Sequence, residues 1–217
     1  MIKIAKRPKP RILIQNAARW TRVLQETRAV SGDESAARAR YRDDSILREL
    51  KLETGGKCCY CECEVTPGLY NIVEHILPWS EFAQLAYFWS NLLLICERCN
   101  SFKGAKYDRD DPNINPIRDE PSHHLLYAGP VALAKSQKGR RALIDTRLNR
   151  PDLYESRRKH LRRIERMARS VRRDLLADLQ VGSPLHDSYI AAENPYSRCA
   201  AVFIDLNHSV WMKDTSG

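Results

Sequence analysis

The chain has 217 residues, with 36 lysines and arginines against 27 acidic residues, for a formal net charge of +9 at pH 7. This length allows one large domain or a small catalytic module with helical flanks, and it can bury a core without disulfides. The charge favours a polyanionic partner, but charge alone does not separate DNA from RNA or from a membrane surface.

The amino-terminal part, residues 1–56, is expected to form a basic arm followed by a helical scaffold. The arm, residues 1–11, carries five lysines or arginines and two prolines and is expected as an edge strand or a flexible phosphate contact. It has no long apolar core, so we expect no signal peptide and a cytoplasmic protein. Helical patterns run from Asn16 to about Val30 and from Asp33 to about Leu52, and Gly55-Gly56 stops the second helix.

Two cysteine pairs follow this scaffold. Cys58-x-x-Cys61 lies in a turn-rich stretch, and Cys96-x-x-Cys99 follows an apolar run. Four thiolates in two such pairs meet the tetrahedral geometry of structural Zn²⁺. The alternative is that they are buried reduced thiols, which behave as small hydrophobic side chains. The remaining cysteines are Cys59, Cys63 and Cys199, of which Cys63 could replace Cys61 as a ligand.

An acid, a histidine and two asparagines lie between and beside the cysteine pairs. Residues 72–78 read as a short strand broken by a proline, and this strand carries Glu74 and His75. Asn91 begins the apolar stretch before the second cysteine pair, and Asn100 opens a helical turn after it. If zinc joins the two ends, these four side chains can converge. Asn91 could instead cap a helix, which is a common role for asparagine.

The carboxyl-terminal part, residues 111–217, is expected to be helical. An acidic, turn-rich stretch over residues 108–116 leads into it, and this stretch is either a capped connector or a second metal-proximal loop. Residues 151–180 read as one long helix with a proline in its first turn and one apolar stripe. Its other faces are rich in arginine, which suits bidentate phosphate contact but could equally be a solvated basic face. The apolar stretch over residues 82–96 is too short and too polar to span a bilayer.

The spaced elements of the central segment resemble the HNH endonuclease motif over roughly residues 57–107. The resemblance is carried by Cys58-x-x-Cys61, Glu74-His75-Ile76-x-Pro78, Asn91-Leu92-Leu93 and Cys96-x-x-Cys99-Asn100-x-x-Lys103. Many members of that superfamily have histidine at the position of Asn100, so this chain is an H-N-N variant. The resemblance implies an α+β fold, mainly α, in which a zinc-stabilised ββα-metal core at residues 57–110 is flanked by N- and C-terminal helices.

The same resemblance implies a role for each matched residue. Glu74 and Asn100 are expected to ligate Mg²⁺ or Mn²⁺, His75 to act as general base, and Asn91 to hold the loop and the imidazole. Oxygen ligands suit Mg²⁺, and a histidine that titrates near neutral pH can take a proton from water. Lys103 is a candidate phosphate contact or a solvated charge. The candidate nucleic-acid contacts on the long helix are Arg162, Arg166 and Arg169.

Short outer motifs resemble a narrower family, the HNH subunit of Septu-type and retron-associated anti-phage systems, which works with an ATPase partner. They are the basic start at residues 1–6, Asn115-Pro116-Ile117, and the stretch from Gly139 through Ile144-Asp145 to Leu148-Asn149-Arg150. Since the sequence has no G-x-x-x-x-G-K-[ST] loop, we expect ATP-driven control to come from another protein.

We therefore expect a zinc-stabilised, Mg²⁺-dependent endonuclease that hydrolyses phosphodiester bonds, with DNA as the expected substrate and anti-phage defence as its setting. One alternative is a non-catalytic zinc-finger module that binds nucleic acid through the arginine-rich helix. Another is an interaction subunit that docks to a partner through the same helix, and this is compatible with the nuclease hypothesis.

Overall fold

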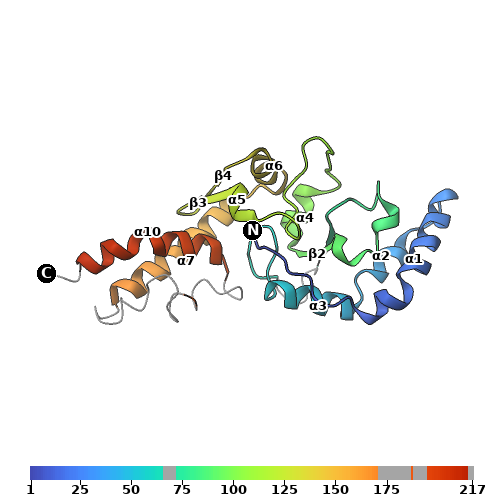
Figure 1. Cartoon of the computed structure of the whole chain (residues 1–217), viewed down its shortest axis with the longest axis horizontal. Helices are drawn as coiled ribbons and strands as arrows, with labels where there is room; N and C mark the ends of the chain where they lie inside the picture. The colour runs from blue at the N-terminus through green and yellow to red at the C-terminus, as the bar shows by residue number, and fades with distance from the viewer. Residues whose placement is uncertain (66–71, 171–186, 188–194, 215–217) are drawn as a thin grey trace.

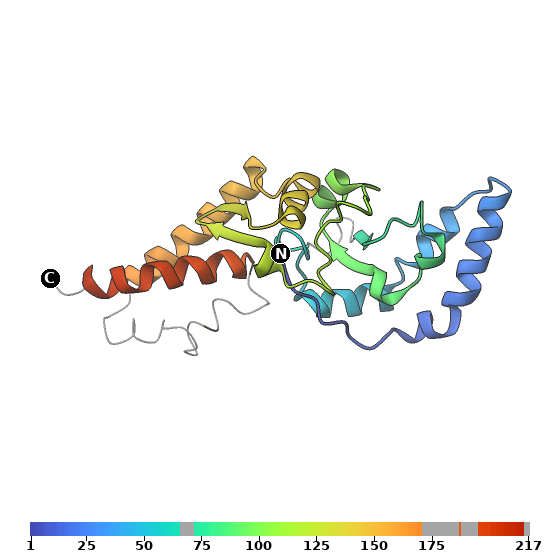
Figure 2. The ribbon, with the colours of Figure 1, turned by 45° about the horizontal axis from the view of Figure 1, so that its top comes forward.

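The computed structural model describes residues 1–65, 72–170, 187 and 195–214. Figures 1 and 2 show an elongated arrangement in which a central strand and helix unit lies between N-terminal helices at one end and two long C-terminal helices at the other. The fold is mainly helical α+β, as predicted, with two small antiparallel sheets. Within the described residues, no helix is both long enough and apolar enough to cross a bilayer.

The N-terminal scaffold consists of α1 (Arg11–Ala29), α2 (Ser35–Arg40) and α3 (Asp44–Thr54). The single helix expected over residues 33–52 is thus wrong, because the chain turns before Asp43, whose side chain caps α3 by accepting a hydrogen bond from Ser45 N at 2.9 Å. The predicted stop is confirmed: Gly55 follows α3 in the left-handed conformation with φ 60°.

The N-terminal arm is neither an edge strand nor a flexible segment. Ile2 and Ile4 are buried, and their backbone N–H groups donate to Cys59 O and Pro116 O at 2.8 and 2.9 Å. Lys6 Nζ lies 2.8 Å from a Glu53 carboxylate oxygen and 3.5 Å from the centre of the Trp89 ring. The arm therefore holds the scaffold, the central unit and the C-terminal part together.

The central unit has the predicted ββα order. Strands β1 (Ile72–His75) and β2 (Leu92–Ile95) pair antiparallel, with His75 opposite Leu92, and α4 (Glu97–Lys103) follows directly. Two short 3₁₀ turns, η1 (Ala83–Leu85) and η2 (Trp89–Asn91), lie in the connection between the strands. Helix α3 packs on β2 and α4 packs on β1, so the hairpin lies between two helices.

A second hairpin follows the central unit. Its elements are α5 (Pro121–His124), β3 (Leu125–Ala128), β4 (Val131–Ala134) and α6 (Gln137–Thr146). Helix α6 packs on β4 and on α4, which joins this part to the central unit. The approach is close at Gly139, where an added Cβ would lie 2.0 Å from the His124 carbonyl oxygen. Only glycine fits at that position.

The C-terminal helices are α7 (Pro151–Ser170), which begins at its proline as predicted, and α10 (Ser197–Asp214), which packs on α7 and β3. Residues 171–180 of the predicted long helix lie outside the described residues. The predicted apolar stripe is confirmed at Leu161 and Ile164, whereas Tyr154 is 37% exposed. Arg157 is fully buried; its Nη1 donates to Leu148 O at 2.8 Å and Pro130 O at 3.2 Å, whereas Nε and Nη2 have no hydrogen-bond partner among the described residues.

The buried arm leads to a stability prediction. We expect Ile4→Ala to lower the free energy of unfolding by about 2–5 kcal/mol, because it removes a buried side chain and leaves a cavity. Lys9→Ala, at an exposed position in the same arm, should change it by less than about 0.5 kcal/mol. Urea denaturation followed by circular dichroism measures both. Equal stability of the two variants would show that the arm does not pack in solution.

Candidate active site and metal centre

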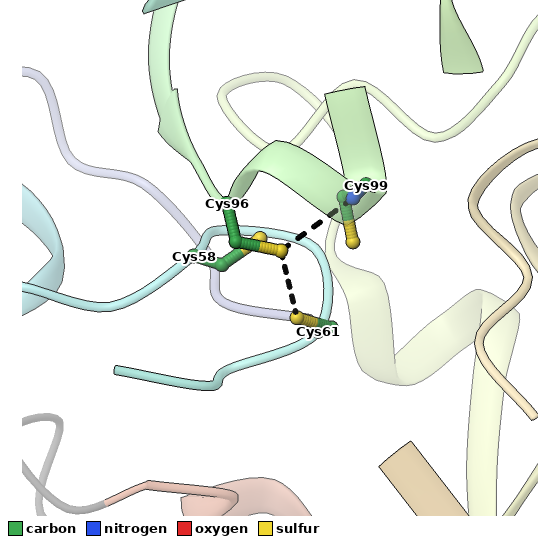
Figure 3. Close-up of side chains that lie close together, drawn as sticks. All are labelled: Cys58, Cys61, Cys96 and Cys99. Carbon is green, nitrogen blue, oxygen red and sulfur yellow. Dashed lines mark hydrogen bonds between the residues drawn. The ribbon is translucent and has the colours of Figure 1, made fainter. Parts of the chain in front are cut away.

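The four predicted zinc ligands lie together. The Sγ atoms of Cys58, Cys61, Cys96 and Cys99 are all within 4.8 Å of one another, and Figure 3 shows them converging from the turn after α3 and from the start of α4. Cys61 Sγ and Cys96 Sγ are 3.7 Å apart. Zinc–sulfur bonds of 2.3 Å in a tetrahedron would separate the sulfurs by about 3.8 Å, so the cluster has the dimensions of a thiolate zinc site.

The charge state of the cluster depends on its own hydrogen bonds and on a neighbouring arginine. Hydrogen bonds within the cluster, with that from Cys58 first, lower the pKa of Cys61 and bring that of Cys96 to about 4, whereas burial raises the pKa of Cys58 and the hydrogen bond with Cys58 raises that of Cys99. Arg150, which is 8% exposed, places Nη1 3.7 Å from Cys99 Sγ. Burial alone would lower the pKa of Arg150, but the thiolates of Cys99 and Cys61 outweigh burial and raise it. Arg150 thus acts as a counter-charge to the thiolates, a role that the sequence did not reveal.

The spare thiols lie outside the four-cysteine group, as predicted. Cys59 and Cys199 are buried, and Cys199 Sγ lies 3.0 Å from the Gly129 carbonyl oxygen. Cys63 is half-buried and its Sγ lies 3.2 Å from Cys61 Sγ. Cys63 is therefore next to the cluster without being one of its four members.

His75 lies at the end of β1 in a largely enclosed position. Its Nε2 is 2.9 Å from the Ala86 carbonyl oxygen, which can only accept, so Nε2 carries the proton and Nδ1 has the free lone pair. The imidazole stacks on Trp79 at 6.0 Å and meets the edge of Tyr41 at 4.9 Å between ring centres. Burial lowers the pKa of His75 to about 4, so the ring is neutral near pH 7.

Glu74 and Lys103 form a buried ion pair between β1 and α4. Their side chains are 5% and 2% exposed, and the ammonium contacts Glu74 Oε1. Burial raises the pKa of Glu74, and the charge of Lys103 opposes that shift. Lys103 Nζ also lies 3.4 Å from the His75 carbonyl oxygen. A phosphate contact by Lys103 stays a prediction, and it requires the ammonium to leave this pair.

Asn91 holds the connection between the two strands. Its Oδ1 accepts from Leu77 N at 2.8 Å, and its Nδ2 donates to Leu77 O and Leu85 O at 3.0 and 3.1 Å. Leu85 precedes Ala86, whose carbonyl fixes the imidazole of His75. This buried amide is thus fully used in positioning the loop around His75, and it caps no helix.

Asn100 lies on α4, one turn before Lys103, and residues three apart share a helix face. Since Lys103 reaches Glu74, this face is directed toward β1. The Asn100 side chain is half-buried and makes no hydrogen bond in the part of the chain that is described. Its amide oxygen is therefore available to a ligand, although the structure records no contact between it and Glu74.

The arginine-rich helix lies apart from these residues. Its first turn does lie beside the cysteine cluster, since the Asp152 carboxylate forms an ion pair with Arg98 of α4 at 2.6 Å. The arginines predicted to bind nucleic acid are further along the helix. Arg162 and Arg166 are exposed about ten or more residues further along, roughly 15 Å or more at 1.5 Å per residue. Of Arg169 only the helical backbone is described. A nucleic-acid contact by these arginines remains a prediction.

Comparison with known proteins identifies the central segment. Residues 58–106 match the HNH endonuclease family, which includes both cysteine pairs and the residues from Glu74 to Lys103. The Septu protein PtuB of Bacillus thuringiensis is 37% identical over 100 residues, covering 46% of this chain and 39% of that protein. The Septu protein PtuB of Bacillus mycoides (strain KBAB4) is 29% identical over 158 residues, covering 58% of this chain and 54% of that protein.

The matches thus span about half or less of the length of these curated relatives. The matched segment, residues 58–106, contains β1, β2 and α4, the cysteine cluster and His75. The chain therefore carries an HNH endonuclease domain at residues 58–106, within a sequence similar to the Septu protein PtuB.

Proposed function

We propose that this chain is a metal-dependent endonuclease that hydrolyses phosphodiester bonds, with DNA as its substrate. One observation carries the proposal: Glu74 and His75 at the end of β1 adjoin the face of α4 that bears Asn100 and Lys103. A carboxylate, a neutral imidazole and a free amide oxygen are a set suited to hydrolysis with one hard cation. A zinc-finger binding module does not require this set.

Two metals fit the residues present. Four clustered thiolates with an arginine counter-charge suit a structural Zn²⁺. The carboxylate of Glu74, whose Oε1 is paired with Lys103, and the amide oxygen of Asn100 are hard oxygen donors, as Mg²⁺ or Mn²⁺ prefers; a cation bound to Glu74 would replace that ion pair. When bound there, such a cation would stabilise negative charge on the phosphate and on the leaving oxygen.

The chain's own residues supply the proton transfer and its orientation. Nδ1 of His75 takes a proton from the attacking water, because Nε2 is committed to the Ala86 carbonyl. Tyr41 and Trp79 keep the ring in one plane. Asn91 fixes the connection that carries Ala86. The base is thus held before substrate arrives.

The exposed arginines of α7 would bind the phosphate backbone outside the catalytic centre. Arg162 and Arg166 are exposed, and the chain has a net charge of +9. Arginine presents a planar set of donors to phosphate oxygens. We include Arg169, on the same helix, in this proposal.

We further propose that the protein is an effector of anti-phage defence that works with an ATPase partner in the cytoplasm. The similarity to two proteins named Septu protein PtuB supports this setting. All seven cysteines are free, which suits a reducing compartment. Copurification of an ATPase with the tagged chain from its native host would test the partner.

His75→Ala should lower Mg²⁺-dependent cleavage by about 100- to 10,000-fold, because the general base is lost. Zinc content should not change. His123→Ala, an exposed histidine outside the site, is the matched control and should cleave normally. Plasmid, single-stranded DNA and RNA serve as substrates in a gel assay. Undiminished cleavage by His75→Ala would sink the assignment, and binding without any cleavage by the unaltered protein would favour the zinc-finger module.

Cys58→Ala should remove zinc and lower the melting temperature, since the cluster joins the turn after α3 to α4. Cys59→Ala changes an adjacent, equally buried thiol outside the cluster and should keep about one zinc per chain. Elemental analysis of the purified variants measures the metal. Full zinc occupancy in Cys58→Ala would reject the proposed ligand set.

Changing Arg162 and Arg166 together to alanine should weaken DNA binding and reduce the slope of log affinity against log salt by about 1–2. Arg158→Ala on the same helix is the control, because Arg158 is already paired with Glu155 at 2.6 Å. Fluorescence anisotropy over a salt series gives both slopes. An unchanged slope in the double variant would show that α7 does not contact phosphate.

A further inference from the structure

The cysteines of the central unit differ in how far solvent reaches them. Cys58, Cys61 and Cys99 are at most 1% exposed. Cys96 and the spare Cys63 are half-buried, and both line a cavity of about 300 Å³ beside the start of α4 and the start of α7. A metal ion that enters or leaves the cluster through this cavity therefore meets these two thiols first.

Cys63 lies against the cluster without belonging to it. Its Sγ is 3.2 Å from Cys61 Sγ, yet Cys63 is not among the four thiols whose sulfurs are all within 4.8 Å of one another. Since zinc bonds a thiolate sulfur at about 2.3 Å, an ion on Cys61 would be no more than about 5.5 Å from Cys63 Sγ. A fifth sulfur is therefore within reach of the ion through a change of side-chain rotamer.

The turn over residues 58–63 holds these two sulfurs together. Glu62 lies between the two cysteines with φ 66°, a left-handed conformation that costs free energy for a residue with a side chain. Hydrogen bonds from Cys58 N to Cys63 O and from Glu62 N to Cys58 O, each at 2.9 Å, close the turn. The Glu62 carboxylate accepts from Ser197 Oγ at 3.2 Å. The backbone is thus fixed in a strained form that keeps Cys63 beside a ligand.

Two carboxylates at this cavity favour the approach of a cation. Glu64 and Glu97 line it, both are exposed, and neither forms an ion pair among the described residues. Each directly follows one of the two half-buried thiols in the sequence. The positive charges in the wall, Arg98 and Arg150, are paired with Asp152 at 2.6 and 3.3 Å. Because carboxylate oxygens are themselves zinc ligands, the two glutamates can attract a hydrated ion to the thiols.

We propose that Cys63 is an exchangeable fifth ligand of the zinc cluster, which takes the place of Cys61 on the metal while the ion enters or leaves through this cavity. In the exchange, the Cys63 thiol loses its proton and bonds the ion as the bond to Cys61 breaks, and the Cys61 thiolate takes up a proton. The reverse steps deliver the ion to its four permanent ligands. Because thiolates favour soft and borderline cations, Cd²⁺ would follow the same route.

This role goes beyond the proposed function and rests only on its structural zinc site. A structural site with four protein ligands is closed, so an ion leaves it only when one ligand is released. An adjacent thiol can replace the released ligand, so that the ion is not left with three protein groups alone. Cys63 would thus let the metal exchange although three of its four permanent ligands are buried.

The first test measures metal exchange in the full chain loaded with zinc. The protein is incubated with an excess of isotopically enriched zinc, desalted and analysed by elemental mass spectrometry. Cys63→Ser keeps the size of the side chain but replaces the thiol by a poor zinc ligand. We expect this variant to keep about one zinc per chain and to exchange it about tenfold or more slowly. Cys199→Ser, at a buried thiol outside the cluster, is the matched control and should exchange at the rate of the unaltered protein.

The second test removes Cys61 itself. Cys61→Ala should still bind about one metal ion per chain, because Cys63 supplies the fourth sulfur, whereas Cys61→Ala combined with Cys63→Ser should lose most of the metal. Loading with Cd²⁺ gives a readout that does not depend on activity, since each cadmium–thiolate bond adds charge-transfer absorption in the ultraviolet. The single variant should keep the absorption of the unaltered protein, and the double variant should fall below it.

Equal exchange rates for Cys63→Ser and the unaltered protein would overturn the proposal, as would equal metal loss from Cys61→Ala and the double variant. Loss of zinc from Cys63→Ser before any exchange would also overturn it, because Cys63 would then be a permanent ligand. A chain that binds no zinc rejects the zinc site and this role with it.

The nuclease proposal fails separately. Mg²⁺-dependent cleavage with equal exchange rates keeps the nuclease and rejects the role of Cys63. Slowed exchange in Cys63→Ser, with no cleavage by the unaltered protein, keeps the role of Cys63 and rejects the nuclease.

Discussion

The convergence of four cysteines is the constraint on which the rest of the structure depends. Strands β1 and β2 have only four residues each, and a two-stranded ribbon of that length is not stable by itself. Cys61 and Cys96 are 35 positions apart and 3.7 Å apart in space, so the cluster closes the base of the hairpin. Arg150 extends the constraint to the segment that enters α7.

This closure places charged groups in a site that could not otherwise hold them. Glu74 and Lys103 are both nearly inaccessible, and two buried charges are tolerated only when they are paired in fixed geometry. Because α4 begins at the cluster and ends at Lys103, the cluster sets the position of that ammonium. The same helix carries Asn100, so the donors proposed for the cation depend on the thiolates one turn away.

Short-range features of the site could be predicted from sequence, and long-range ones could not. The cysteine spacing, the stop at Gly55 and the start at Pro151 are set by local chemistry, so the ββα order and several helix ends followed from the sequence. The burial of Arg150 and Arg157 depends on carbonyls and thiolates that arrive from other elements. A pattern of basic residues along one helix does not show which of them the fold will bury.

Among the described cations, two physical classes differ in the contribution to binding that each would make. Exposed arginines such as Arg162 would attract phosphate from solution, which gives affinity that falls with salt and carries no sequence information. Paired cations such as Arg141 have little net field left, and what they fix is the wall of the cavity that Asn91 and Lys103 also line. The exposed cations would therefore draw the substrate to the protein. The paired cations would select among substrates through the shape and hydrogen bonds of the wall that they fix. The net charge of +9 describes a long-range attraction to polyanions and carries no information on which substrate is selected.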